Sequence, residues 1–350
     1  MKRVWALLSV LVLAGVALAA PNPSLVGKPV PSLEFTEFAD AAFPENSVEA
    51  CKGEVVLLVY LRTSCPGCRV MFQPIGKARD RFPQTDVHVV ATTNDSRNLF
   101  RRYLVFQAEG KLIDFPVAIR SNGNWGVTAL PMAYVIGRDG KVAWSGYRDS
   151  GFAKAMETAI AAPDPYLPEG WKGARKALAN LSKGKYAKAL EAARKAKESE
   201  ESAAAGAYVE KRVVVHLERA LAAADRHLGR GDVYSACAAL EAAEKSFKGM
   251  DLVTRIARKR TEIESREGHA DACATWKELA SVWAGARKGK SGVKAGIPKL
   301  GAILKKATDP KVKAAAKELL EVLTKPWTQK DAATMGGLLE NPNGGCGDGS

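Results

Sequence analysis

The sequence is poor in the residues that metal sites and nucleic-acid surfaces require. Its 350 residues include four histidines and six cysteines, and 7% of the residues are aromatic. A single pair of cysteines is separated by two residues, and neither a second such pair nor two histidines at zinc-finger spacing accompany it. We therefore expect no bound metal and no other cofactor.

Most of the excess positive charge of the chain lies in its second half. Residues 166–330 hold 34 Lys and Arg against 20 Asp and Glu, an excess of 14 that equals the net charge of +14. These charges lie among alanines at helical spacing with few aromatic residues between them, which indicates solvated helix faces and argues against nucleic acid as a partner. Weak attraction to an anionic membrane or cell-wall polymer stays open.

No apolar run after residue 18 is long enough to span a membrane. The chain starts with a short basic stretch, Met1–Arg3, continues with the apolar run Val4–Leu18, and has small residues at 17 and 19. This pattern predicts a signal peptide over residues 1–19 and a mature protein outside the cytoplasm, periplasmic or secreted. An uncleaved signal that anchors the protein in the membrane is the alternative.

The two closely spaced cysteines stand where a strand is expected to end and a helix to begin. Ser64-Cys-Pro-Gly-Cys68 follows the apolar run Glu54–Leu61 and precedes a helical pattern. A helix N-terminus favours a thiolate, so we predict Cys65 as the nucleophile and Cys68, one turn later, as the resolving thiol. Pro66 suits the first helical turn, where its missing N–H costs nothing, and Gly67 completes the motif.

The hydrophobic pattern around this motif alternates between strands and helices. It predicts a short strand over 33–38, buried strands at 54–62, 86–92 and 132–136, helices at 66–82, after Ser96 and at 150–162, and a hairpin turn at 137–140. His88 is expected to be a packed side chain rather than a ligand.

Residues 25–162 resemble the thioredoxin fold and, within it, the extracytoplasmic thiol-disulfide oxidoreductases of the TlpA and cytochrome-maturation type. The matching segments are 27–31, 52–58, 65–68, 126–131 and 136–142. The resemblance implies a cis Leu130–Pro131 bond beside the dithiol, with the backbone of Leu130 pairing with a substrate polypeptide. It also implies protein thiols or disulfides as substrates, and an electron-transfer partner that the sequence does not identify.

Two positions depart from the pattern of this family. Ser64 stands where many relatives have tryptophan, and Val59 stands where some thioredoxins bury an acid. Proton transfer to Cys68 is therefore expected to use water. A related peroxidase would need proline and threonine or serine where this chain has Leu58 and Arg62, which argues against that activity.

A proline-rich linker at 163–168 precedes an alanine-rich, helical second domain over 169–325. Segments around Gly184 and Gly231 resemble the helix-turn-helix of tetratricopeptide repeats, although the two glycines are 47 residues apart instead of the usual 34. A long helix is expected between 202 and 228, followed by four more helices. Residues 326–350 are expected to form a flexible tail that exposes Cys346.

The role of the helical domain is open between a concave surface for a protein partner and a structural spacer. Cys237 and Cys273 could pair between adjacent helices. The predicted architecture is thus an α/β thioredoxin-like domain followed by an all-α helical-repeat domain. Its leading function is thiol-disulfide exchange, and the alternative is a helical interaction or envelope-maintenance protein whose dithiol is vestigial or structural.

Overall fold

The computed structural model describes residues 25–39, 47–82, 87–106, 115–120, 125, 127, 129–147, 151–326 and 328. The predicted signal peptide, Cys346 and nearly all of the predicted tail lie outside these residues. In the first part of the chain the strands are β1 (Glu37–Phe38), β2 (Val55–Tyr60), β3 (Val87–Thr93), β4 (Val117–Ile119), β5 (Met132–Ile136) and β6 (Val142–Tyr147). The helices there are α1 (Pro66–Arg81), α2 (Arg97–Phe106) and α3 (Phe152–Ala161).

These strands form one mixed sheet in the order β1-β4-β3-β2-β5-β6. The strands β2, β3 and β4 run parallel, because α1 and α2 are the crossovers between them, and β5 and β6 pair antiparallel as a hairpin. The predicted thioredoxin-like α/β architecture is confirmed. The predicted strand at 33–38 is shorter than expected, since only Glu37 and Phe38 pair with β4, whereas Glu34 makes an isolated bridge to Ser47.

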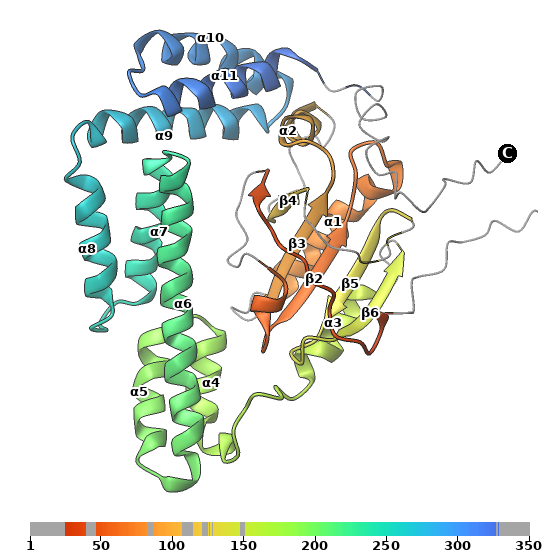
Figure 1. Cartoon of the computed structure of the whole chain (residues 1–350), viewed down its shortest axis with the longest axis vertical. Coiled ribbons are helices and arrows are strands. Elements are labelled where there is room, and N and C mark those ends of the chain that lie inside the picture. The colour runs from red at the N-terminus through yellow and green to blue at the C-terminus, as the bar shows by residue number, and fades with distance from the viewer. Residues whose placement is uncertain are drawn as a thin grey trace, which may run out of the picture.

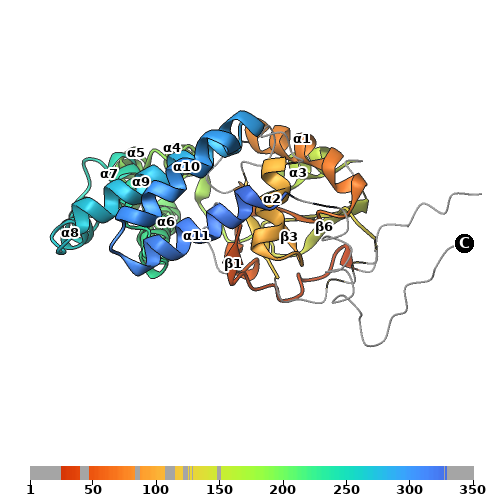
Figure 2. The same ribbon diagram turned by 90° about the horizontal axis from the view of Figure 1, so that it is seen from above.

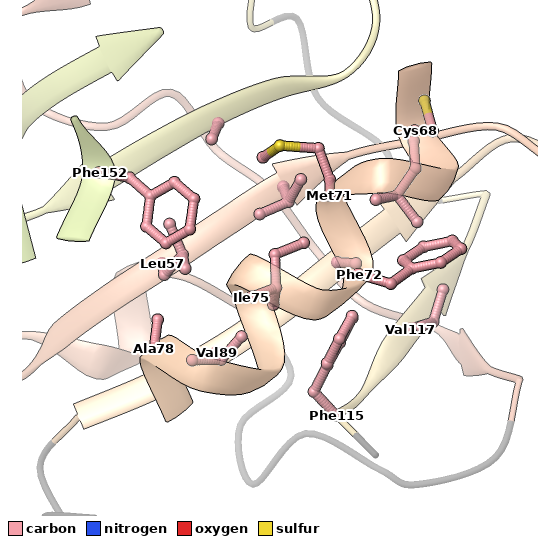
Figure 3. Close-up of a cluster of buried hydrophobic side chains, with 14 of the residues drawn as sticks. Leu57, Cys68, Met71, Phe72, Ile75, Ala78, Val89, Phe115, Val117 and Phe152 are labelled. Atoms are coloured by element: carbon pink, nitrogen blue, oxygen red, sulfur yellow. The ribbon is translucent and has the colours of Figure 1, made fainter. Parts of the chain in front are cut away.

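Both faces of the sheet are buried, which explains why β2 is apolar at nearly every position. One face packs against α1, α2 and α3, and Figure 3 shows Met71, Phe72 and Ile75 of α1 standing over Leu57 and Val89. The other face is covered by the N-terminal segment around Leu33 and Phe35. Cys68 belongs to the first cluster, so the second cysteine of the motif is anchored in the core.

Helices make up the regular structure of residues 171–324. They are α4 (Arg175–Ser182), α5 (Tyr186–Lys197), α6 (Ala203–Gly229), α7 (Val233–Ser246), α8 (Val253–Glu264), α9 (His269–Ala286), α10 (Lys290–Lys306) and α11 (Pro310–Thr324), with short 3-10 turns at Trp171–Ala174 and Glu200–Ser202. The predicted turns at Gly184 and Gly231 are confirmed, with φ of 65° and 80°. The predicted long helix is α6. Cys237 on α7 and Cys273 on α9 are free thiols, so the disulfide considered between them is not formed.

The helical region curves around one side of the sheet and meets it again at its far end (Figures 1 and 2). Helices α4 to α8 share one apolar core, and α9 to α11 share another that includes Val105 of α2. Arg101 of α2 lies 4.4 Å above the ring of Trp283 and 3.1 Å from Glu318 of α11. The two regions are therefore packed together and not joined by the linker alone.

Candidate active site

Cys65 lies at the N-terminus of α1, in the loop that leaves β2. Its extended backbone (φ −88°, ψ 110°) makes it the N-cap residue, and its sulfur accepts the backbone N–H of Cys68 at 3.1 Å. The thiol in turn donates to the carbonyl oxygen of Leu130 at 3.5 Å. The side chain is half-buried, so an incoming sulfur can still reach it.

This position makes Cys65 the more acidic thiol of the pair. A hydrogen bond from the Cys68 side chain is the largest cause that lowers the pKa of Cys65, and burial opposes it. The backbone N–H groups of Cys68 and Gly67 and the charge of Arg62 lower it further, so the pKa of Cys65 falls to about 7. A large part of Cys65 is then thiolate near neutral pH, which is the form that attacks disulfides.

Cys68 has the opposite environment. It is fully buried, and the hydrogen bond to Cys65, burial and the charge of Cys65 all raise the pKa of its thiol. A thiol that stays protonated in the resting state is suited to act second, after a partner has bonded to Cys65. This asymmetry supports the nucleophilic role of Cys65 and the resolving role of Cys68, which stay predictions.

The predicted cis Leu130–Pro131 bond is confirmed, and the structure places it against the motif. A Cβ added to Gly67 would lie 3.3 Å from Cδ of Pro131, so the α1 N-terminus and the proline loop are in close contact. Around this contact Pro66 is exposed and Val70 is 65% exposed. The nucleophile thus stands in a partly apolar surface that a polypeptide chain could cover.

A buried acid near the dithiol was missed from the sequence. Asp95, directly after β3, is fully buried, and its Oδ2 accepts the backbone N–H of Thr63 at 2.6 Å. Its Oδ1 lies 3.9 Å from Nε of Arg62. The sequence signal that could have found it is an aspartate directly after the buried strand β3. Because β3 runs parallel to β2, the residues that follow the two strands lie at the same edge of the sheet.

A second buried acid, Glu54, lies at the opposite end of β2. One oxygen lies 2.6 Å from Nε2 of His88, and the other accepts Nη1 of Arg219 at 2.6 Å and a hydrogen bond from Arg212. Burial alone raises the pKa of Glu54, but His88 and Arg219 outweigh it and hold this pKa well below its usual range. Because both arginines belong to α6, the cluster joins the sheet to the helical region.

Cys51, Glu54 and His88 also place three potential metal ligands within 4.8 Å of one another. Their surroundings do not suit a cation, because Arg212 and Arg219 already bind one oxygen of Glu54 and would repel a metal ion there. His88 lies at hydrogen-bond distance from Glu54, which the expectation of a merely packed side chain did not include.

No protein-family model and no curated protein matches the sequence. Among solved structures, the chain resembles a thioredoxin-family thiol:disulfide interchange protein from Chlorobium tepidum, with 21% identity over 38% of this chain and 96% of that one and a TM-score of 0.31. A thiol-disulfide isomerase from Corynebacterium glutamicum has 15% identity over 37% of this chain and 94% of that one, with a TM-score of 0.30. StoA from Bacillus subtilis has 13% identity over 36% of this chain and 98% of that one, with a TM-score of 0.29.

Proposed function

We propose that this protein is a thiol-disulfide oxidoreductase that acts on protein thiols or disulfides outside the cytoplasm. The observation that carries the proposal is the asymmetric dithiol, in which an accessible Cys65 with a lowered pKa caps α1 and a buried Cys68 lies one turn below it. In the reducing direction, the Cys65 thiolate attacks a substrate disulfide and Cys68 then displaces the substrate. The oxidising direction is the reverse of these steps.

Polypeptide substrates are favoured by the surface around Cys65. The half-buried Leu130, whose carbonyl oxygen lies 3.5 Å from the Cys65 sulfur, offers a backbone contact, and the exposed Val70 of α1 offers an apolar contact. An extended substrate segment beside Leu130, with its sulfur over Cys65, would use both.

The location outside the cytoplasm is supported by the N-terminal sequence pattern and by the chemistry, since disulfides persist there. Within the described residues, no helix is long and apolar enough to cross a membrane. We assign the protein to the TlpA-like type of oxidoreductase because segments on both sides of its dithiol match that type. The paired helices around Gly184 and Gly231 support a tetratricopeptide-like region that recruits a protein partner.

The test is a trapping experiment with a purified disulfide-containing peptide as substrate. Cys68→Ser removes the second attack while leaving the nucleophile, so it should accumulate a peptide adduct on Cys65 that a reductant releases. Wild type should instead turn the peptide over and end with a bond between Cys65 and Cys68.

Two matched variants make the result specific. Cys65→Ser should form no adduct, whereas Cys237→Ser, which removes a thiol on α7 of the helical region, should behave as wild type. Equal adduct formation by Cys65→Ser, or none by Cys68→Ser, would reject the oxidoreductase function and leave the interaction protein as the better hypothesis.

A further inference from the structure

The resolving cysteine needs a base. Cys68 is fully buried with a raised pKa, yet its thiol must lose a proton before its sulfur can attack the mixed disulfide on Cys65. Val59, at the position where some thioredoxins bury an acid, is apolar and buried in the sheet. A proton acceptor must therefore come from another element.

Asp95 reaches the dithiol from the end of the neighbouring strand. Its Oδ2 accepts the N–H of Thr63 at 2.6 Å, and the carbonyl of the adjacent residue, Arg62, accepts the N–H of Cys65 at 3.2 Å. The carboxylate and the first cysteine are therefore bound to two consecutive residues of the loop that leads into α1, whose Cα atoms are about 3.8 Å apart. After the hydrogen bond to Cys65, burial and the charge of Cys65, the charge of Asp95 is a further cause that raises the pKa of Cys68.

Asp95 also has an unused acceptor. Its Oδ1 is buried and makes no hydrogen bond to any residue that the structure describes. The same holds for Thr63 Oγ1 and Arg62 Nε. A buried acceptor without a hydrogen bond costs stability, and Arg62 Nε, 3.9 Å away, compensates only its charge, so a carboxylate oxygen left in this state at the loop of the dithiol points to a functional use.

We propose that Asp95 accepts the proton of Cys68 during the resolving step, taking the place of the acid that is missing at Val59. The inference rests on the proposed thiol-disulfide exchange. As the Cys68 proton passes to Asp95 through one bridging water, the Cys68 sulfur bonds to the Cys65 sulfur and the bond between Cys65 and the substrate breaks. The electron pair leaves with the substrate sulfur, which takes up a proton, and the protonated Asp95 returns its proton to solvent.

The other groups around Cys68 do not compete for this role. Arg62 is a cation without acceptor capacity, and its charge instead favours the Cys65 thiolate. Tyr103 on α2 is a buried phenol whose pKa burial raises to about 12, so it is not a base near neutral pH. Among the described residues whose charge acts on Cys68, Asp95 is the remaining carboxylate.

The two chemical steps can be timed separately with a small aromatic disulfide that releases a coloured thiol at each step, in a background with Cys237, Cys273 and Cys346 replaced by serine. Asp95→Asn keeps an oxygen for the Thr63 N–H but cannot accept a proton. It should slow release of the second thiol by about 10-fold or more near pH 7, a modest effect for a general base. The first release, which depends on Cys65, should stay within about 2-fold of its wild-type rate.

The sign of the effect separates proton transfer from a purely electrostatic role. If Asp95 acts only through its charge, Asp95→Asn lowers the pKa of Cys68 and speeds the second release, which would overturn the proposal. An unchanged second release would overturn it as well. Slowing by Asp95→Ala but not by Asp95→Asn would mean that Asp95 only positions the loop through Thr63.

Two controls complete the design. Asp139→Asn alters an exposed aspartate that likewise accepts a backbone N–H, from Lys141 at 3.0 Å, and should change neither release. If Asp95→Asn does not fold, the pH dependence of the second release rate in wild type tests the proposal instead. An internal base predicts a rate that is nearly constant between about pH 6 and pH 8. A tenfold rise per pH unit would contradict the proposal. If wild type shows no first release that depends on Cys65, the proposed function itself fails.

Discussion

Replacing Glu54 by glutamine should destabilise the protein at the contact between the sheet and the helical region. Glu54 is fully buried, and the side chains of its partners Arg212 and Arg219 are 13% and 9% exposed. Gln keeps the shape but removes the negative charge, leaving two guanidinium groups beside a neutral amide. Breaking a buried ion pair in this way costs about 3 to 5 kcal/mol, a large fraction of the roughly 5 to 15 kcal/mol that holds a typical domain folded.

Urea unfolding at neutral pH measures this loss of stability as a lower urea midpoint. Circular dichroism detects the unfolding of the helices, and tryptophan fluorescence detects the unfolding of both regions. Glu241→Gln is the matched control, because Glu241 is an exposed acid that pairs with Lys245 one helical turn away. Its midpoint should not move. A loss below about 1 kcal/mol for Glu54→Gln would show that the cluster does not hold the two regions together, since a buried pair is expected to cost more.

Three further predictions follow from the same structure. The alkylation rate of Cys65 should rise through a midpoint near its pKa of about 7, and at pH 6 its thiolate fraction should be about 100-fold above that of an ordinary thiol; a midpoint near 9.0 would contradict the assigned environment. The pKa of Glu54 is lowered on folding, so its ionised form stabilises the folded state above the unfolded pKa of about 4.3, and this stabilisation is lost as pH falls below that value. Acidification should therefore lower the unfolding free energy of wild type more steeply than that of Glu54→Gln. A fragment of residues 20–165 should exchange small disulfides at the wild-type rate but unfold at lower urea, because Val105, 3% exposed here, loses its cover from α9 to α11; an unfolded fragment would show that the two regions share one core.

The sequence was sufficient for features whose signal is local. The apolar run of β2, the cysteine motif that follows it and the hairpin at 137–140 lie within short stretches, and β2, β3, β5 and α1 formed within about two residues of their predicted bounds. The cis proline came from resemblance, because nothing in Leu130–Pro131 alone distinguishes it from an ordinary turn.

Features created by distant residues escaped prediction. Glu54 looks like the polar start of a strand, and its arginine partners are 158 and 165 residues away. Asp95 follows a different strand from the cysteines, so its approach to Thr63 exists only once the sheet is formed. The packing of α2 on α9 and α11 likewise depends on the path of the whole helical region. The apolar stripe of an amphipathic helix shows which face is buried, but it does not show against which partner that face packs.

The most direct test of the central claim is the redox equilibrium of Cys65 and Cys68 in the full chain. The protein would be equilibrated in glutathione buffers of stepped redox poise, quenched with acid, and mapped for the disulfide by mass spectrometry. Thiol-disulfide exchange predicts a single Cys65–Cys68 disulfide that forms and is reduced reversibly. The redox poise at which half of the protein carries this disulfide indicates whether the protein reduces or oxidises its substrates. A Cys65–Cys68 pair that stays reduced at every poise, or that cannot be reduced once formed, would contradict it.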